Sequence, residues 1–374
     1  MLDFTPTDEQ RMIADTMAQV LADHGLPAPV SPDRATLWQA VAGLGMAGLP
    51  FAEAQGGAGL GVADMVCALI EGGRFGADLP MLSSALLPAL CLRHAGADAL
   101  PGDTVAALVA GRVTLGAAID DAPLAPLCVR AAAGGVRLTG RKVACLGADM
   151  AAAHLVVGDA AVFLVPADVP GLTSAPCTLV DGRAAGELQF DDVVLPDRAR
   201  IGDADLAALL RDAGSLALAA DALGAMERIN AMTLEHLKTR RQFGRPIGNF
   251  QVLQHRMVDM VHETEHLKSL VQLAAAECDT GRGDDGAKRR ARAVSRLRRH
   301  IATRIRPAAA SAIQLHGGIG MTEDYVLGAL VKRVLVANML FGTADDHAAR
   351  LRRFLAAETA PADSALQGPK PEGY

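Results

Sequence analysis

The chain has 374 residues, of which 51% are hydrophobic and 21% charged, so it can bury a large core and has room for roughly two or three domains. Only 3% of the residues are aromatic, which leaves Ala, Leu and Val as the main apolar side chains and favours packed helices. The net charge of −6 argues against general nucleic-acid binding, for which a strong positive charge is expected.

The first part of the chain, up to about residue 110, has a helical pattern. Thr7, followed by Glu9 and Gln10, predicts a capped helix start. The apolar-periodic face of this helix is expected to comprise Met12, Ile13, Met17, Val20 and Leu21. A second helical segment covers residues 37–49 and ends at Pro50. A glycine-rich loop, AEAQGGAGLG, then precedes further helices to about residue 92.

The pattern changes between residues 112 and 201. Gly, Pro and Asp turns alternate, at intervals of about 8–12 residues, with short runs that contain β-branched residues. These runs are VTLGAAI, LCVRA, GVRLTG, HLVVG, AVFLVPA and GELQFDDVVLP. This spacing is typical of a sheet or a barrel.

Helical periodicity returns after residue 202. One predicted helix face collects Leu223, Met226, Asn230, Thr233 and Leu237. Three more amphipathic segments follow, and the short links between them predict an antiparallel four-helix bundle. We therefore expect an all-α N-terminal domain (1–111), a middle β-domain (112–201), a C-terminal four-helix bundle (202–358) and a flexible tail (359–374).

Three features indicate a cytoplasmic protein. The six cysteines are scattered without a CxxC pair, which suits free thiols in a reducing compartment. The start MLDFTPTDEQ lacks a basic and an apolar leader region. No uncharged apolar run reaches the roughly 20 residues that a bilayer requires, so we expect no membrane partner.

Residues His262 to His266 spell HExxH, a pattern that on a helix can chelate zinc while the Glu activates water. A zinc site needs a third ligand, and the sequence places none nearby. We therefore interpret these residues as a solvated helix face and expect no metal site.

The segment from Lys288 to Arg306 is strongly basic but interleaves with an apolar stripe, so a charged bundle face is the simplest interpretation. Binding of a phosphorylated cofactor or a subunit contact remains an alternative. The glycines of 56–61 and of 317–320 match neither a Walker loop nor a Rossmann fingerprint.

Two further sequence motifs carry more chemical information. The segment TRRQFGRPIGNFQVLQ, from Thr239 to Gln254, combines arginines with Phe243, which suits a dinucleotide because guanidinium groups bind pyrophosphate and an aromatic ring can stack. In AIQLHGGIGMTEDY, from Ala312 to Tyr325, the glycines allow backbone amides to approach a phosphate closely.

With these motifs, the chain resembles the acyl-CoA dehydrogenase family over nearly its whole length. RRQFGRPIGNFQVLQ and QLHGGIGMTEDY resemble the two most diagnostic C-terminal motifs of that family, and FTPTDEQRMI and GELQFDDVVLP resemble its N-terminal and β-domain segments. In detail the chain is most similar to small subunits of two-component members such as pimeloyl-CoA dehydrogenase and the steroid side-chain dehydrogenases. The resemblance implies a mainly α fold with a β-domain, usually tetrameric, with one FAD per active site.

The resemblance also implies where FAD binds and what the reaction needs. The implied cofactor-binding residues are Arg240, Gln242, Phe243, Gln251, Gln314, Gly317, Gly318 and Thr343. In the family, a carboxylate removes the α-proton of an acyl-CoA thioester while the β-carbon gives hydride to the flavin. The positions that would hold this carboxylate are occupied by Phe341 and Gly214, so the usual base is missing.

The β-domain also lacks residues that the resemblance predicts around the flavin and the thioester. The loop that holds the flavin ring and the thioester is the shorter AIDDAP, at 118–123, and an aromatic and hydroxyl pair becomes Ala144 and Leu146. Because the motifs that reach a neighbour's FAD are intact while the chain's own site is eroded, we infer a half-site subunit with an acyl-CoA substrate and a Glu-bearing large subunit as partner. An electron-transferring flavoprotein is the implied acceptor, and fatty acid or steroid catabolism is the implied setting.

Two alternatives stay open. The chain could be a self-sufficient homo-oligomeric flavoenzyme that uses a displaced acid, for which Asp221, Asp345 and Asp346 are the candidates. Alternatively, it could be a non-catalytic scaffold that binds acyl-CoA or protein.

Overall fold

The structure is a computed structural model that describes residues 5–28, 33–281 and 283–359. The predicted flexible tail therefore lies outside the described residues, except for Thr359. Within the described part, helices come first, strands follow, and a second set of helices closes the chain, as the sequence predicted. The exact domain boundaries remain predictions.

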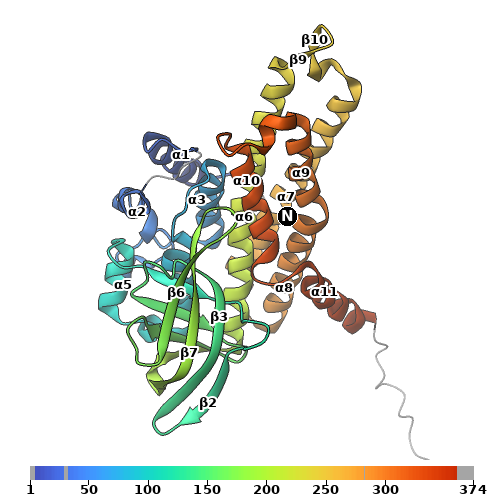
Figure 1. Cartoon of the computed structure of the whole chain (residues 1–374). Coiled ribbons are helices and arrows are strands. Elements are labelled where there is room, and N and C mark those ends of the chain that lie inside the picture. Colours follow the sequence, from blue (N-terminus) through green and yellow to red (C-terminus); the bar gives the residue numbers. More distant parts are fainter. Residues whose placement is uncertain (1–4, 29–32, 282, 360–374) are drawn as a thin grey trace, which may run out of the picture.

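The N-terminal helices pack beside one another at the left of Figure 1. They are α1 (Asp8–Asp23), α2 (Arg34–Gly43), α3 (Val62–Phe75), α4 (Leu87–Ala95) and α5 (Gly102–Val109), and a π-helical turn, η3 (Leu82–Leu86), precedes α4. Thr7 caps α1 through a capping box with Gln10, as expected. Of the predicted apolar face of α1, Met12 is wrongly placed, because its side chain is 63% exposed.

The strands form one eight-stranded sheet in the order β6-β7-β3-β1-β4-β5-β8, and β2 pairs with β3 at the side. Their bounds are β1 (Leu115–Ala118), β2 (Cys128–Ala132), β3 (Gly135–Leu146), β4 (Ala153–Val157), β5 (Ala161–Pro166), β6 (Leu172–Thr178), β7 (Ala184–Pro196) and β8 (Arg200–Asp203). The pair β1–β4 is parallel, and the other ladders of this sheet are antiparallel.

The C-terminal helices stand at the right of Figure 1. They are α6 (Ala204–Thr239), α7 (Gln251–Thr280), α8 (Gly283–His300), α9 (Arg306–His316), α10 (Leu327–Met339) and α11 (Ala344–Thr359). A π-helical turn, η7 (Ile301–Ile305), joins α8 to α9, and η6 (Ile247–Asn249) and η8 (Gly317–Met321) are short 3₁₀ turns. A small hairpin of β9 (Arg241–Gln242) and β10 (Arg245–Pro246) links α6 to α7.

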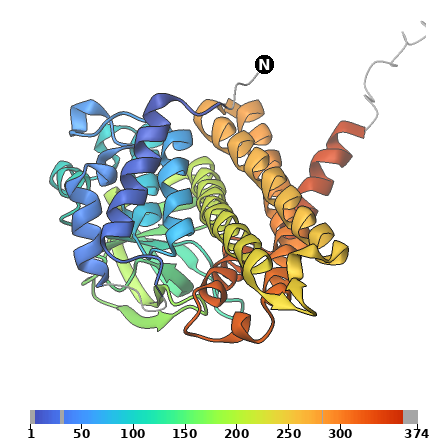
Figure 2. The same cartoon turned by 90° about the horizontal axis from the view of Figure 1, so that it is seen from above.

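Helix α6 lies at the centre of the molecule, between the N-terminal helices and α7 (Figure 2). All five residues of its predicted inner face are buried. Glycines allow α3 and α6 to cross in backbone contact, because a Cβ at Gly73 would lie 1.9 Å from the carbonyl oxygen of Asp221 and one at Gly224 would lie 1.8 Å from that of Ile70. The main core cluster continues from α1 through β1 and β4 into the bundle, and a smaller cluster fills the other face of the sheet.

No single helix in the described ranges combines the length and the apolar composition needed to cross a bilayer. The helices α10 and α11 meet that test only together, as a pair bent by 44°. All six cysteines are free.

Candidate functional site

A cavity of about 460 Å³ opens at the tip of the bundle, where the end of α6 meets the end of α9. Its lining residues are His236, Arg240, Gln242, Ile247, Gln314, Leu315, His316, Gly317, Gly318 and Ile319. The two motifs that the sequence singled out therefore meet in space, although they lie far apart along the chain. A Cβ at Gly317 or Gly318 would meet nothing within 4 Å, so a ligand can approach the backbone there.

The hairpin β9–β10 projects beyond the rest of the bundle (Figure 1). Its two-residue turn holds Phe243 at φ 52° and Gly244 at φ 79°, the positive-φ pair of a type I′ turn. A bulky residue in this region of backbone space is strained, and such strain concentrates at functional positions. Phe243 is also 90% exposed and meets Phe250 edge-on, with ring centroids 6.0 Å apart. An exposed aromatic residue that is fixed in this way suits contact with another molecule.

The chain also contributes a histidine pair to this cavity, which the sequence analysis missed. The rings of His236 and His316 stack with centroids 4.5 Å apart. Burial lowers the pKa of both imidazoles, and for His236 the neighbouring His316 and Arg240 add to this effect. The signal was present in the sequence, because His236 precedes Arg240 by one helical turn and His316 lies within QLHGG.

Not every predicted cofactor residue lines this cavity. Phe243 lies in the hairpin turn, Gln251 is the first residue of α7, and Thr343 lies before α11. The Thr343 hydroxyl donates to Oδ2 of Asp346 at 2.7 Å, as part of the start of α11. These three positions are therefore not brought into the tip cavity.

Gly214 and Phe341, the two positions to which the resemblance assigns the base, do meet. A Cβ at Gly214 would lie 3.0 Å from Cδ2 of Phe341 and 3.2 Å from Cδ1 of Ile119. Phe341 is 5% exposed and has φ 60°, and its N–H donates to Oδ2 of Asp120 at 2.8 Å. The hydroxyl of Ser215 donates to the carbonyl oxygen of Phe341 at 3.2 Å. The ring of Phe341 therefore packs directly against Gly214.

The loop at 118–123 is bound to the protein interior. Lys142 is fully buried, and its Nζ lies 2.8 Å from Oδ1 of Asp121 and donates to the carbonyl oxygens of Ile119 and Val157. Burial lowers the pKa of Lys142 and raises the pKa of Asp120. The two loop carboxylates thus have internal partners, and the segment AIDDAP contains no hydroxyl side chain.

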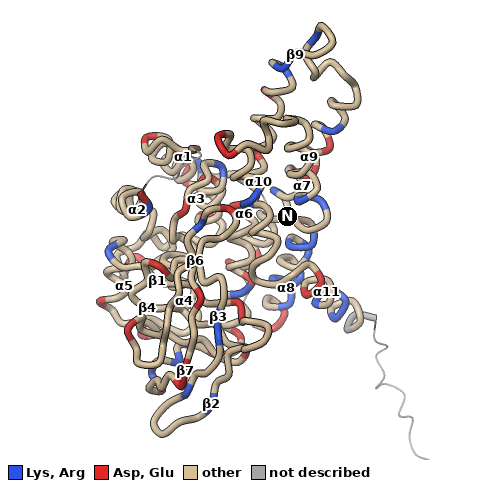
Figure 3. The backbone as a smooth tube through the Cα atoms, in the orientation of Figure 1, with Lys and Arg blue, Asp and Glu red and all other residues tan. Residues whose placement is uncertain are grey.

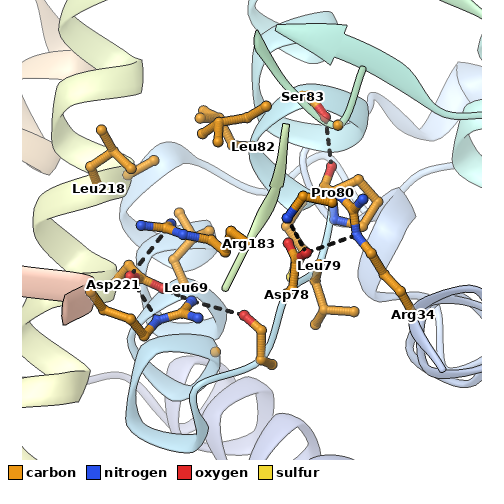
Figure 4. Close-up of a pocket in the computed structure, with 18 residues that line it drawn as sticks. Arg34, Leu69, Asp78, Leu79, Pro80, Leu82, Ser83, Arg183, Leu218 and Asp221 are labelled. Atoms are coloured by element: carbon orange, nitrogen blue, oxygen red, sulfur yellow. Dashed lines mark hydrogen bonds and ion pairs between the residues drawn. The ribbon is translucent and has the colours of Figure 1, made fainter. Parts of the chain in front are cut away.

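The candidate acid Asp221 lies beside a small cavity of about 60 Å³ between α3, the sheet and α6 (Figure 4). Its Oδ1 accepts from Nη2 of Arg333 at 2.5 Å and its Oδ2 from Nε at 3.2 Å, while Nη1 of Arg183 lies 3.7 Å from Oδ2. Arg333 is 3% exposed, so this is a buried ion pair. A carboxylate held by two guanidinium groups, beside room for only a few water molecules, is poorly suited to take a substrate proton.

The other two candidate acids, Asp345 and Asp346, lie in the first turn of α11. The Asp346 carboxylate accepts from the N–H and the hydroxyl of Thr343, and these hydrogen bonds lower its pKa. Asp345 is exposed in the same first turn, where an acid interacts favourably with the helix dipole.

Known proteins are similar to this chain over most of its length. The family model described as "Acyl-CoA dehydrogenase, N-terminal domain" matches residues 7–112, and "Acyl-CoA dehydrogenase, C-terminal domain" matches residues 212–356. The chain is 31% identical over 346 residues to acyl-CoA dehydrogenase IpdE2 of Mycobacterium tuberculosis, which covers 88% of this chain and 92% of that protein.

Solved structures show the same fold. The ChsE4-ChsE5 complex from Mycobacterium tuberculosis contains a chain with TM-score 0.84 and 25% identity, covering 96% of this chain and all of that one. A variant of the Tcur3481-Tcur3483 steroid ACAD contains a chain with TM-score 0.83 and 28% identity, covering 94% of this chain and 98% of that one.

Proposed function

Because the chain belongs to the acyl-CoA dehydrogenase family, we propose that it is a half-site subunit of an FAD-dependent acyl-CoA dehydrogenase. FAD is the cofactor of this family. In this proposal, the bundle-tip cavity completes the FAD site of a partner chain, and that partner carries the catalytic Glu. The chain's own base position takes no part in proton abstraction.

The proposal is supported by the contrast between the tip cavity and the contact of Gly214 with Phe341. The tip cavity is open and combines Arg240 with two glutamines and two glycines, a donor set that fits the pyrophosphate of a dinucleotide. The side chains that meet at Gly214 are the apolar Phe341 and Ile119, and the nearby Asp120 carboxylate already accepts from the Phe341 N–H. This contrast supports a cofactor contact at the tip cavity rather than a flavin-ring site beside Phe341.

The nature of the partner follows from the same contrast. Proton abstraction from the α-carbon of a thioester needs a carboxylate within hydrogen-bond reach. A partner chain of the same family with an intact Glu would supply it, and the exposed Phe243 and the hairpin that carries it suit contact with that chain. Two of the similar solved structures are named as pairs of proteins, which agrees with a two-component assembly. The acyl group is proposed to be bulky or dicarboxylic, in line with the small-subunit resemblance.

The first test is the visible spectrum of the chain purified alone, before and after addition of FAD. We expect a colourless protein without acyl-CoA dehydrogenase activity, and flavin only when a Glu-bearing partner is co-expressed. A yellow isolated chain that oxidises acyl-CoA would overturn the proposal in favour of the homo-oligomeric enzyme. Absence of flavin in every pairing would instead favour the non-catalytic scaffold.

The second test uses the hetero-oligomer and a matched pair of arginines. Arg240 lines the tip cavity, whereas its neighbour Arg241 does not and donates to the carbonyl oxygen of Gly244. We expect Arg240→Ala to lower FAD affinity by about tenfold or more, the value of a lost charge-assisted hydrogen bond, and Arg241→Ala to change it little. Equal effects of the two variants would contradict the assignment.

A further inference from the structure

A group of metal-ligating side chains gathers where α7 passes the end of α8, away from the tip cavity and from Phe341. Glu263 and His266 come from α7, and His300 is the last residue of α8. One donor atom from each of these residues lies within 4.8 Å of the others. Lys and Arg residues also occur along this part of the bundle (Figure 3).

The two α7 residues share a helix face because they are three positions apart. The ring of His300 already faces them, since its Nε2 lies 3.1 Å from the carbonyl oxygen of Glu263 and 3.6 Å from Oε2 of the same residue. The rings of His266 and His300 have centroids 4.6 Å apart and are tilted by 56°. Packing of the helices thus brings His300 to the two α7 residues, which are neighbours on one helix face.

The donor set has the chemistry of a zinc site. Two imidazoles and one carboxylate are a known ligand set for Zn²⁺ with an open fourth position, and a Glu-x-x-His pattern on one helix is a recurrent ligand pair in helical bundles. Zinc with bonds of about 2.1 Å places its ligands about 3.4 Å apart, which is closer than the present limit of 4.8 Å. His266 is exposed and Glu263 is half-buried, so rotation of these two side chains can close the difference.

Two present interactions of the ligand residues must break when a metal binds. The Nη1 atom of Arg304 lies 4.0 Å from Oε1 of Glu263, but its side chain is 66% exposed and can turn into solvent. The hydrogen bond between His300 and the Glu263 carbonyl must also give way if Nε2 becomes the ligand. Burial is the largest influence on His300 and lowers its pKa, which favours the neutral imidazole that a metal needs.

We propose that Glu263, His266 and His300 bind a divalent transition-metal ion, with Zn²⁺ as the preferred ion, and that the bound ion joins α7 to the end of α8. The HExxH motif enters this site through its Glu263 and His266 only. His262, the other histidine of the motif, is exposed and does not belong to the group. The inference is independent of the proposed function, because no residue of the tip cavity takes part.

The experiment is a calorimetric titration of tag-free protein with Zn²⁺ at pH 7.5, with Mg²⁺ as the control ion. We expect one Zn²⁺ per chain and no heat of binding from Mg²⁺, which prefers oxygen ligands. His266→Ala and Glu263→Gln should weaken Zn²⁺ binding by about tenfold or more. The matched control His262→Ala should bind Zn²⁺ as the unmodified chain does.

A second measurement covers the buried ligand, whose replacement could disturb folding. Zn²⁺ should raise the melting temperature of the unmodified chain and of His262→Ala, and this shift should disappear in His300→Ala even where circular dichroism shows native helix content. No Zn²⁺ binding by the unmodified chain, or equal losses in His262→Ala and His266→Ala, would overturn the site. Flavin content of the hetero-oligomer serves as the separate readout, since it reports on the proposed function and not on this site.

Discussion

At the scale of single residues, the fold buries a titratable side chain, that of His154. His154 of β4 is 1% exposed, and neither ring nitrogen has a hydrogen-bond partner among the described residues. Its ring packs against Gly116, where a Cβ would lie 2.5 Å from Nδ1. Burial lowers the pKa of His154 to about 4.

This histidine makes the folding stability depend on pH. The unfolded imidazole titrates near 6.5, so between about pH 6.5 and 4 the unfolded chain binds more protons and the free energy of unfolding falls as the pH falls. We expect His154→Leu to reduce the loss of stability between pH 7.5 and 5 by about 2 kcal/mol, measured by urea denaturation at both pH values. His255→Leu, at an exposed histidine, should leave that loss unchanged. If both variants follow the parent protein, His154 is not the titrating group.

Replacement of Asp221 can show whether this candidate acid is catalytic or structural. Asp221→Asn leaves the buried guanidinium of Arg333 without its carboxylate partner, so we expect a loss of about 3 kcal/mol or more in the free energy of unfolding. Asp345→Asn, at an exposed helix start, should cost less than about 1 kcal/mol. Unchanged stability of Asp221→Asn together with lost turnover in the isolated chain would instead favour Asp221 as the base.

At the scale of elements, the crossing of α3 and α6 depends on the absence of side chains at two glycines. The backbones meet so closely that a methyl group at Gly73 would overlap the carbonyl oxygen of Asp221. The preceding residue of α3 offers a matched comparison, because a Cβ at Gly72 meets nothing within 4 Å.

We predict opposite signs for these neighbouring substitutions. Gly73→Ala should destabilise the protein by about 3 kcal/mol, since the two helix backbones would have to separate. Gly72→Ala should stabilise it by about 0.5–1 kcal/mol through helix propensity. Thermal or urea unfolding of the two variants provides the measurement, and a similar effect of both would show that the crossing is not close-packed.

At the scale of the whole molecule, one core cluster runs through all three parts of the chain. It includes Met17 of α1, Leu155 of β4 and Leu297 of α8. Arg34 adds a polar link, with its Nε 3.2 Å from Asp78 and its Nη1 2.6 Å from Asp149 of the β-region. Parts that share a core are expected to unfold together.

Calorimetry can test this continuity. We expect a single thermal transition, and we expect Arg34→Ala to lower its temperature without splitting it. Two resolved transitions, with only one of them shifted by Arg34→Ala, would show that the β-region or the N-terminal helices unfold separately.

Much of the fold follows from local patterns. The Thr7 capping box, the buried face of α6 and the strands rich in β-branched residues were predictable, because caps and apolar periodicity act over a few residues. The strand β6 was missed because it has no buried alternating face and contains Pro176. The π-helical turns η3 and η7 likewise have no comparable local pattern in the sequence.

The sequence by itself determined the family resemblance and the order of helices and strands, and it showed that Phe341 and Gly214 stand where the resemblance predicts a base, since these depend on residue identity and spacing. Only the tertiary structure decided which side chains meet. It brought Arg240 to Gln314 at the bundle tip, placed Phe341 against Gly214, and set His300 beside Glu263. Such contacts are fixed by how whole helices pack, and the chain distance between the partners carries no signal of them.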